Sequence, residues 1–400
     1  MKKIILPLSF LPFILAIAFA VKTYGAKLLS ITPYQNETPA INPERPLLLK
    51  ETALSDKKIQ VALLLDISGS MDGLIEQAKA KLWRIVNELG DARIGGETPG
   101  LQIALYIYGG DHLNAENGYV KQVTPLTSDL DLISEKLFEL TTNGGEEYCG
   151  KVIATSLDQL LWSNSSEDLK MIFIAGNEPF TQGPVNFRES CRKAVAKDIY
   201  VNTIFCGNYA EGVNTQWKEG AEIGLGQYMY IDHNQTVTYI ATPYDDEISH
   251  LNDQLNQTYI YYGAQGQQMS VRQQAEDEKA NSYSQSNKVT RAISKSKKVY
   301  SNESWDLVDA SKDDEFSVEK IEKSTLPEEY KNLSNEDILA KVEEKNKERS
   351  AIQEKILSLE KERKTFIAEK QKEGAEEKTL DAVLVKTVRE QASKKNYKFE

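Results

Sequence analysis

Apolar and amphipathic stretches alternate between Lys58 and about Gly263, and this alternation is the clearest pattern in the chain. The continuous run Val61–Leu65 is typical of a strand buried on both faces of a parallel sheet. Further strand patterns lie at residues 101–108, 119–124, 171–176, 199–207 and 227–232. Helical spacing is found at residues 73–89, from Ser128, and at 152–162, 187–198, 215–224 and 246–262.

Strands that are separated by helices imply right-handed crossovers and a parallel sheet. The pattern therefore predicts an α/β domain at residues 58–262, with a doubly wound, mostly parallel sheet and helices on both faces. The strand at 119–124 is the most polar, which favours a place at the edge of the sheet. Ser128, Asp129 and Asp131 are suited to cap the start of the following helix.

The composition changes after Gly263. Residues 263–333 offer little to bury, and we expect a polar, partly disordered linker there. Residues 334–400 are rich in charge but carry a narrow apolar seam at steps of three and four. A charged helical hairpin or coiled coil is predicted for this region, and a single solvated helix is the alternative.

The N-terminus resembles an export signal. Two lysines precede an apolar run at residues 4–21. Ala18-Phe19-Ala20 suits a signal peptidase, Tyr24-Gly25-Ala26 is a weaker second choice, and residues 1–26 are predicted as the signal peptide. The alternative is an uncleaved anchor at residues 4–21. A proline-rich linker, residues 27–57, follows. We expect an exported protein that is periplasmic or secreted, or held at the inner membrane if the anchor stays.

The net charge and the cysteine spacing argue against nucleic-acid binding and against a cysteine metal site. The chain has 400 residues and a formal charge of -12, which argues against nucleic-acid binding. Its three cysteines, Cys149, Cys191 and Cys206, have no metal-type spacing. We hypothesise that two of them form a disulfide near the sheet edge, and the alternative is three small buried residues.

The stretch VALLLDISGSMDG carries the most informative chemistry. Asp66, Ser68 and Ser70 follow a buried strand at alternate positions, and Gly69 permits the turn. A carboxylate and two hydroxyls suit a hard cation such as Mg²⁺, Mn²⁺ or Ca²⁺. A serine nucleophile would need an oriented base, but the three histidines form no recognisable arrangement. No catalytic residue is therefore predicted, and we expect a protein that is not an enzyme.

The motif DISGSM, the amphipathic helix after it, and the later Gly-Gly loop resemble the von Willebrand factor type A domain over residues 58–262. In that family the aspartate and both serines bind a divalent cation at a metal-ion-dependent adhesion site, and a partner's carboxylate usually completes the coordination. The resemblance implies metal-binding roles for Asp66, Ser68 and Ser70. The loops are similar to those of an exported bacterial subgroup of the family.

Two loops depart from the family pattern. The loop that normally carries threonine reads NGGEEYCG, so Glu146 or Glu147 stands in its place. The strand that normally ends in Thr-Asp-Gly has Gly176 in place of the aspartate. Glu147 is the predicted fourth metal ligand, since adjacent side chains of an extended loop point to opposite sides. Glu146, together with Asn177 and Glu178, is a candidate for further metal or ligand contacts.

Three interpretations of this variant site stay open: a working metal site, a self-satisfied structural site, and a turn without metal. The predicted function is divalent-cation-dependent binding of another protein, or of a surface or polymer ligand. The alternative is a metal-poor scaffold of the cell envelope that self-associates through its C-terminal helices.

Overall fold

The computed structural model describes residues 55–71, 83–231, 239–372 and 380–399. The predicted signal peptide and most of the predicted linker, up to residue 54, lie outside the described residues. Within the described residues, no helix combines the length and apolar character that crossing a membrane requires.

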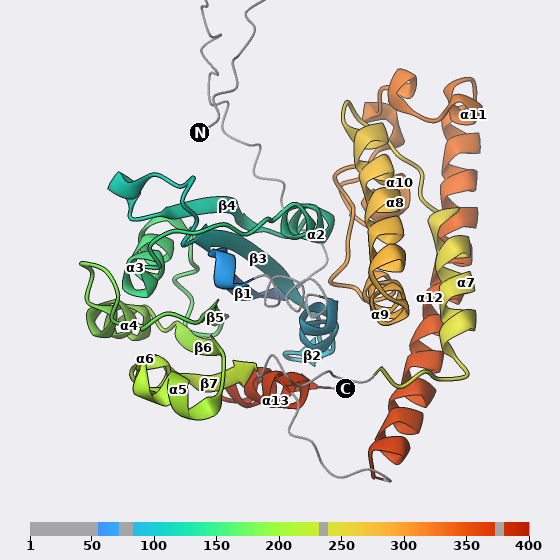
Figure 1. Ribbon diagram of the computed structural model, residues 1–400. Helices are drawn as coiled ribbons and strands as arrows, with labels where there is room; N and C mark the ends of the chain where they lie inside the picture. The colour runs from blue at the N-terminus through green and yellow to red at the C-terminus, as the bar shows by residue number, and fades with distance from the viewer. Residues whose placement is uncertain (1–54, 72–82, 232–238, 373–379, 400) are drawn as a thin grey trace, which may run out of the picture. The chain divides into compact units, whose positions relative to one another are not determined.

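A six-stranded sheet forms the centre of the α/β domain (Figure 1). Its order is β4-β3-β1-β5-β6-β7, and only the pair β3–β4 is antiparallel. Because β2 lies outside this sheet, the order matches the 3-2-1-4-5-6 arrangement of doubly wound folds. The strands are β1 (Ser55–Asp66), β3 (Pro99–Tyr108), β4 (Val120–Thr127), β5 (Leu169–Gly176), β6 (Tyr200–Cys206) and β7 (Leu225–Ile231). All six predicted strands are confirmed, including the edge position of β4.

Helices cover both faces of the sheet. Successive buried side chains of β1 point to opposite faces and so belong to two separate hydrophobic cores. Val61, Leu63 and Leu65 pack against helical residues 83–90 and against α2 (Leu130–Phe138). Ala62 and Leu64 belong to the second core, with α3 (Cys149–Gln159), α4 (Phe187–Ala196) and α6 (Trp217–Ile223). Asp129 caps α2 by accepting from the backbone N–H of Leu132 at 2.9 Å. The short helices are η1 (Gly69–Met71), η2 (Ala115–Asn117) and α5 (Tyr209–Asn214).

The region after the sheet is more ordered than its composition predicts. α7 (Asp245–Asn256) ends earlier than expected, and the predicted linker 263–333 contains further helices with buried apolar residues. They are α8 (Gly266–Tyr283), α9 (Gln285–Lys295), α10 (Leu307–Ala310), η3 (Val318–Lys320), η4 (Lys323–Thr325) and α11 (Glu328–Lys331). The expectation of a partly disordered linker was therefore wrong for these residues.

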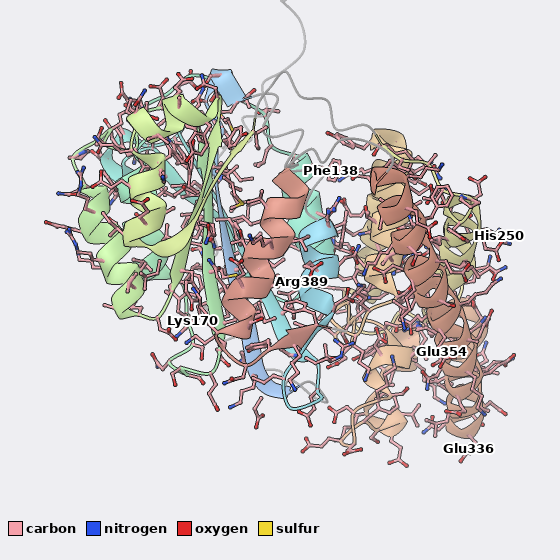
Figure 2. The ribbon with its side chains drawn as sticks, turned by 90° about the horizontal axis from the view of Figure 1, so that it is seen from below. Phe138, Lys170, His250, Glu336, Glu354 and Arg389 are labelled. Atoms are coloured by element: carbon pink, nitrogen blue, oxygen red, sulfur yellow. The ribbon has the colours of Figure 1, made fainter. Side chains whose placement is uncertain are left out.

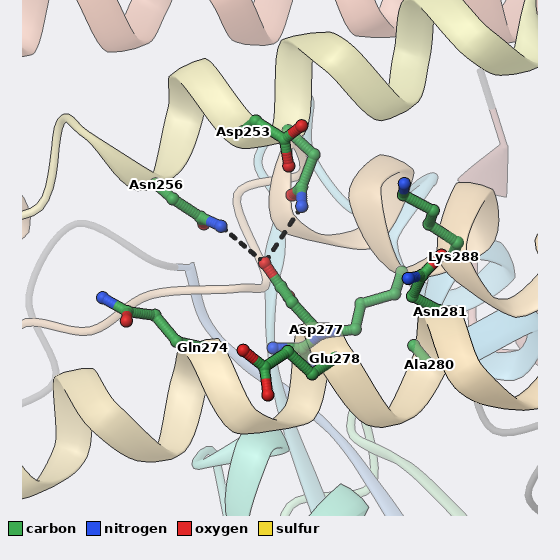
Figure 3. A pocket seen from close by; sticks show the side chains of 10 residues that line it. Asp253, Asn256, Gln274, Asp277, Glu278, Ala280, Asn281 and Lys288 are labelled. Carbon is green, nitrogen blue, oxygen red and sulfur yellow. Dashed lines mark hydrogen bonds and ion pairs between the residues drawn. The ribbon is translucent and has the colours of Figure 1, made fainter.

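Buried ion pairs explain why this polar segment can fold. Arg291 on α9 is 1% exposed, and it donates to Asp131 of α2 at 2.8 Å and also to Asp277 of α8. Asp277 in turn accepts from Asn252 at 2.9 Å and from Asn256 at 2.8 Å (Figure 3). Charged side chains that the composition leads one to expect at the surface are thus paired in the interior, where they hold α8 and α9 against α2.

The two C-terminal helices do not form the predicted hairpin with each other. α12 (Asn335–Lys372) buries Ile352 and Ile356 beside α7 and α9, and it turns charged side chains such as Glu336 and Glu354 outward (Figure 2). α13 (Leu380–Ser393) packs on the sheet instead, with Val388 buried in the first core. The chain ends in β8 (Lys398–Phe399), which pairs with β2 (Ala92–Arg93).

Candidate functional site

The DISGS turn lies at the carboxyl end of β1, in the middle of the sheet. Asp66 is fully buried, and its Oδ1 accepts from the backbone N–H of Ser68 at 2.7 Å. The hydroxyls of Ser68 and Ser70 lie 3.0 Å apart. Ser70 is exposed and donates to Oδ1 of Asn177, which follows β5, at 3.2 Å. The fold thus brings all three residues of the motif together with one predicted further contact.

The Gly-Gly loop adds a second carboxyl group to this site. Glu147 is 5% exposed, and its side chain hydrogen-bonds that of Asp66. Its backbone N–H donates to Oε1 of Gln182 at 3.0 Å, which fixes the loop. Glu146 lies at the surface, where its carboxylate accepts from the amide of Gln182 at 3.5 Å. The two neighbouring glutamates therefore point to different environments, Glu147 inward and Glu146 outward.

Burial governs the electrostatics of the inner pair. Removal from water, and after it the hydrogen bond and negative charge of Asp66, together raise the pKa of Glu147 to about 9. Burial also raises the pKa of Asp66, although the hydrogen bonds with Glu147 and Ser68 lower it in part. Two carboxyl groups this close cannot both ionise easily, so they share a proton when no cation is bound.

The donor set fits a divalent cation. Asp66 Oδ2 and Glu147 Oε2 are buried and have no hydrogen-bond partner. Unpaired buried carboxyl oxygens are costly unless a proton or a cation compensates them. Two carboxylates beside two hydroxyls are hard oxygen ligands of the kind that Mg²⁺ or Mn²⁺ accepts. Among the described residues, no group of three or more His, Cys, Asp or Glu side chains is arranged to hold a metal ion.

Tyr108 is a site residue that the sequence did not reveal. It is buried at the end of β3, and its hydroxyl donates to the carbonyl of Ala175 at 2.9 Å. A Cβ added to Gly176 would lie 2.5 Å from the Tyr108 hydroxyl oxygen and 3.0 Å from the ring of Trp217. The place of the family's second aspartate is therefore filled. A tyrosine at the end of a fully buried strand is the signal that could have revealed it.

Gly109 makes the inner carboxyl pair sterically feasible. Its φ is 82°, and a Cβ there would lie 2.6 Å from Oδ1 of Asp66 and 2.8 Å from Cγ of Glu147. Any larger residue would compete with both carboxyl groups for space. Glu178, partly buried after β5, adds a further negative charge close enough to raise the pKa of both Asp66 and Glu147.

The three cysteines are free and buried, which contradicts the hypothesis of a disulfide. Cys149 and Cys191 lie in the core on one face of the sheet, and Cys206 lies in the core on the other face. Burial raises the pKa of all three thiols, so they resist ionisation. The alternative interpretation, small buried residues, describes them correctly.

No protein-family model and no curated protein sequence matches this chain. Among solved structures, it is similar to the conserved hypothetical protein BatB from Bacteroides thetaiotaomicron, with 18% identity, 44% of this chain and 90% of that chain covered, and a TM-score of 0.34. The SpRpn10 VWA domain has 12% identity, coverage of 44% and 89%, and a TM-score of 0.34. Proximal thread matrix protein 1 from the mussel byssus, with a zinc-occupied MIDAS motif, has 12% identity, coverage of 44% of this chain and 41% of that chain, and a TM-score of 0.32.

Proposed function

We propose that the α/β domain is a von Willebrand factor type A-like domain and that it serves as a divalent-cation-dependent module for binding another protein or a surface polymer. One observation supports this most directly: Asp66 and Glu147 are buried side by side with one unpartnered oxygen each. Such a pair needs a proton or a cation to compensate it, and a divalent cation would do so together with the hydroxyls of Ser68 and Ser70.

Four residues would hold the cation. Asp66 and Glu147 would provide the negative charge, and Ser68 and Ser70 the neutral hydroxyls. When bound, the cation neutralises both inner carboxylates and so favours the association of the two loops that carry them. Mg²⁺ or Mn²⁺ is the proposed ion, with Ca²⁺ as the alternative.

We also propose that the protein works outside the cytoplasm. The support is in the sequence, where two lysines precede the apolar run at residues 4–21. N-terminal sequencing of the protein recovered from periplasm, membrane and medium would test this. A mature N-terminus at residue 21 or, with cleavage at the second choice, at residue 27 is expected, whereas an intact first residue in the membrane fraction would support the anchor.

The scaffold alternative has less support, because its proposed contact surface is already in use. The apolar seam of α12 is buried within the chain, with Ile338, Val342, Ile352 and Ile356 each at most 7% exposed. α13 buries Leu384, Val388 and Ala392 in the first core. Self-association through these helices would therefore require partners for their polar faces.

Calorimetric titration of Mg²⁺ and Mn²⁺ into the full chain tests the metal assignment. Asp66→Asn keeps the shape of the side chain, so we expect a folded protein whose affinity falls by more than about tenfold, since even outer-shell partners of a metal contribute that much. Glu336→Gln, an exposed acid on α12, removes the same charge far from the turn and is the matched control. Equal affinity in wild type and Asp66→Asn would refute the assignment.

A further inference from the structure

The sheet edge that carries the candidate site is strongly acidic. Five described loops form this edge: 67–71, 109–119, 139–148, 177–186 and 207–216. None of them contains Lys or Arg, and His112 is their only basic residue. Their acids are Asp111, Glu116, Glu139, Glu146, Glu147, Glu178 and Glu211. A ligand that approaches these loops therefore meets an excess of negative charge.

Two lysines lie close to these loops, since Lys136 pairs with Glu139 at 2.9 Å and a Cβ added to Gly118 would lie 2.8 Å from Cγ of Lys151. Among the described residues, no ion pair joins a cation to Glu146, Glu178 or Glu211. Arg188 and Lys218 lie on the first turns of α4 and α6, where they pair with Glu219 at 2.6 Å and with Glu222 at 3.8 Å. The opposite sheet edge is different, because acids and bases alternate there, as in the ion pair of Lys395 with Asp198. The excess of acids is thus specific to the loops around Asp66.

A divalent cation at the inner site would leave the rim charged. Asp66 and Glu147 match the two charges of such an ion, and their unpartnered oxygens already call for one. Glu146 is exposed and Glu178 partly exposed, and both lie outside this inner pair. An acidic ligand group would therefore be repelled by the rim even with the metal in place.

Two exposed tyrosines continue the same edge. Tyr209 begins α5 directly after β6, and Tyr230 lies near the end of β7. They are 47% and 39% exposed, and their ring centroids lie 5.6 Å apart in an edge-to-face arrangement. The faces of exposed tyrosine rings attract Arg and Lys side chains. Glu211, on the first turn of the same helix α5, is exposed and accepts from the side-chain amide of Asn208 at 3.2 Å.

We propose that this edge binds a Lys- and Arg-rich extended segment of a partner protein. The acidic rim, which we define as Glu146, Glu178 and Glu211, would pair with its cations, and Tyr209 and Tyr230 would stack on them. The inference rests on the proposed binding function and names the class of partner. It differs from the family pattern, in which the partner supplies a carboxylate.

The dimensions of the edge suit such a segment. Glu178 follows β5 and Tyr230 lies on β7, two strands away, which corresponds to about 10 Å. In a polyproline II segment, residues three apart lie on the same side and about 9 Å from each other. Cations at every third position would therefore reach the rim and the tyrosines together.

The test uses the full chain and two synthetic probes, (Arg-Pro-Pro)₄ and (Glu-Pro-Pro)₄, followed by fluorescence anisotropy with Mg²⁺ or with EDTA. We expect the arginine probe to bind and the glutamate probe not to bind. Glu146→Gln and Glu178→Gln should each weaken binding by up to about fivefold, with a further loss at high salt. Glu336→Gln, with the same change in net charge, should bind as wild type does.

The tyrosines have their own matched pair of variants. Tyr230→Phe keeps the aromatic face and should retain binding, whereas Tyr230→Leu keeps apolar area only and should lose up to about fivefold. Preferred binding of the glutamate probe, no binding of either probe, or equal binding in the rim variants and in Glu336→Gln would overturn the inference. Retained Mg²⁺ binding in those cases leaves the proposed function standing. Arginine-probe binding without any Mg²⁺ binding would instead overturn the proposed function and support the inference.

Discussion

The shared proton of Asp66 and Glu147 predicts an unusual dependence of stability on pH. In the folded protein, burial and the neighbouring carboxyl group raise the pKa of Glu147 from 4.5 to about 9. The unfolded chain releases this proton above about pH 4.5, whereas the folded chain keeps it. The free energy of unfolding in the absence of metal should therefore fall as the pH rises from about 4.5 to about 9.

The magnitude follows from one proton. A difference of one bound proton changes the free energy of unfolding by about 1.4 kcal/mol per pH unit, so about 3 kcal/mol should be lost between pH 6 and pH 8. Glu147→Gln should abolish this contribution, because its amide donates to Asp66 at every pH and carries no charge. Saturating Mg²⁺ should also reduce the slope in wild type, since the cation replaces the proton.

Urea unfolding of both proteins at pH 6, 7 and 8, with EDTA and with Mg²⁺, measures these slopes. Comparing wild type with the variant cancels the contributions of titrating groups outside the pair Asp66 and Glu147. Equal slopes in EDTA would refute the shared proton. A slope in wild type that Mg²⁺ leaves unchanged would instead refute the replacement of the proton by the cation.

Three further predictions concern packing and the thiols. Gly176→Asp should lower the free energy of unfolding, measured with urea, by about 1–3 kcal/mol, because its Cβ would meet the Tyr108 hydroxyl. In the double variant with Tyr108→Phe, the loss of free energy should be smaller than the sum of the losses in the two single variants. Arg291→Met removes the cation that pairs with the buried Asp131, while the partly buried Asp277 keeps Lys295, and it should cost about 3 kcal/mol; Lys347→Met, at an exposed position of α12, should change stability by less than about 1 kcal/mol. Thiol titration should detect no reactive cysteine in the native protein and three after unfolding; fewer than three would reveal a disulfide.

The α/β domain could be predicted because its signals are local. A continuous apolar run such as Val61–Leu65 has one stable use in a soluble protein, a strand buried on both faces. Asp129 could be expected to cap α2 because a side-chain acceptor directly precedes an amphipathic stretch. Connection rules then restrict the order of parallel strands to few arrangements.

The helical region could not be predicted in the same way, because its fold depends on pairs far apart in sequence. Arg349 of α12 is 1% exposed and donates to Asp306 at 2.6 Å and to Asp309 at 3.0 Å. In the sequence each of these residues adds to polarity and favours disorder. Buried together, the arginine pairs with both carboxyl groups, so their charges oppose folding less than unpaired buried charges would. Composition alone cannot distinguish these two situations.

The site shows the same limit at the level of single side chains. The sequence suggests that Glu147 compensates for the acid that is absent at Gly176, and it does keep the number of acidic groups at the site the same. In space, both positions border the carboxyl group of Asp66, since a Cβ at Gly176 would also lie 3.1 Å from its Oδ2, but they hold different groups. The carboxyl group of Glu147 lies beside Asp66 where Gly109 leaves room, whereas the place beside Gly176 holds the Tyr108 hydroxyl and the Trp217 ring. The two departures from the family pattern therefore belong to one rearrangement. A glycine at 176 admits the buried aromatic groups, a glycine at 109 admits the glutamate, and an aspartate restored at 176 would clash rather than complete the site.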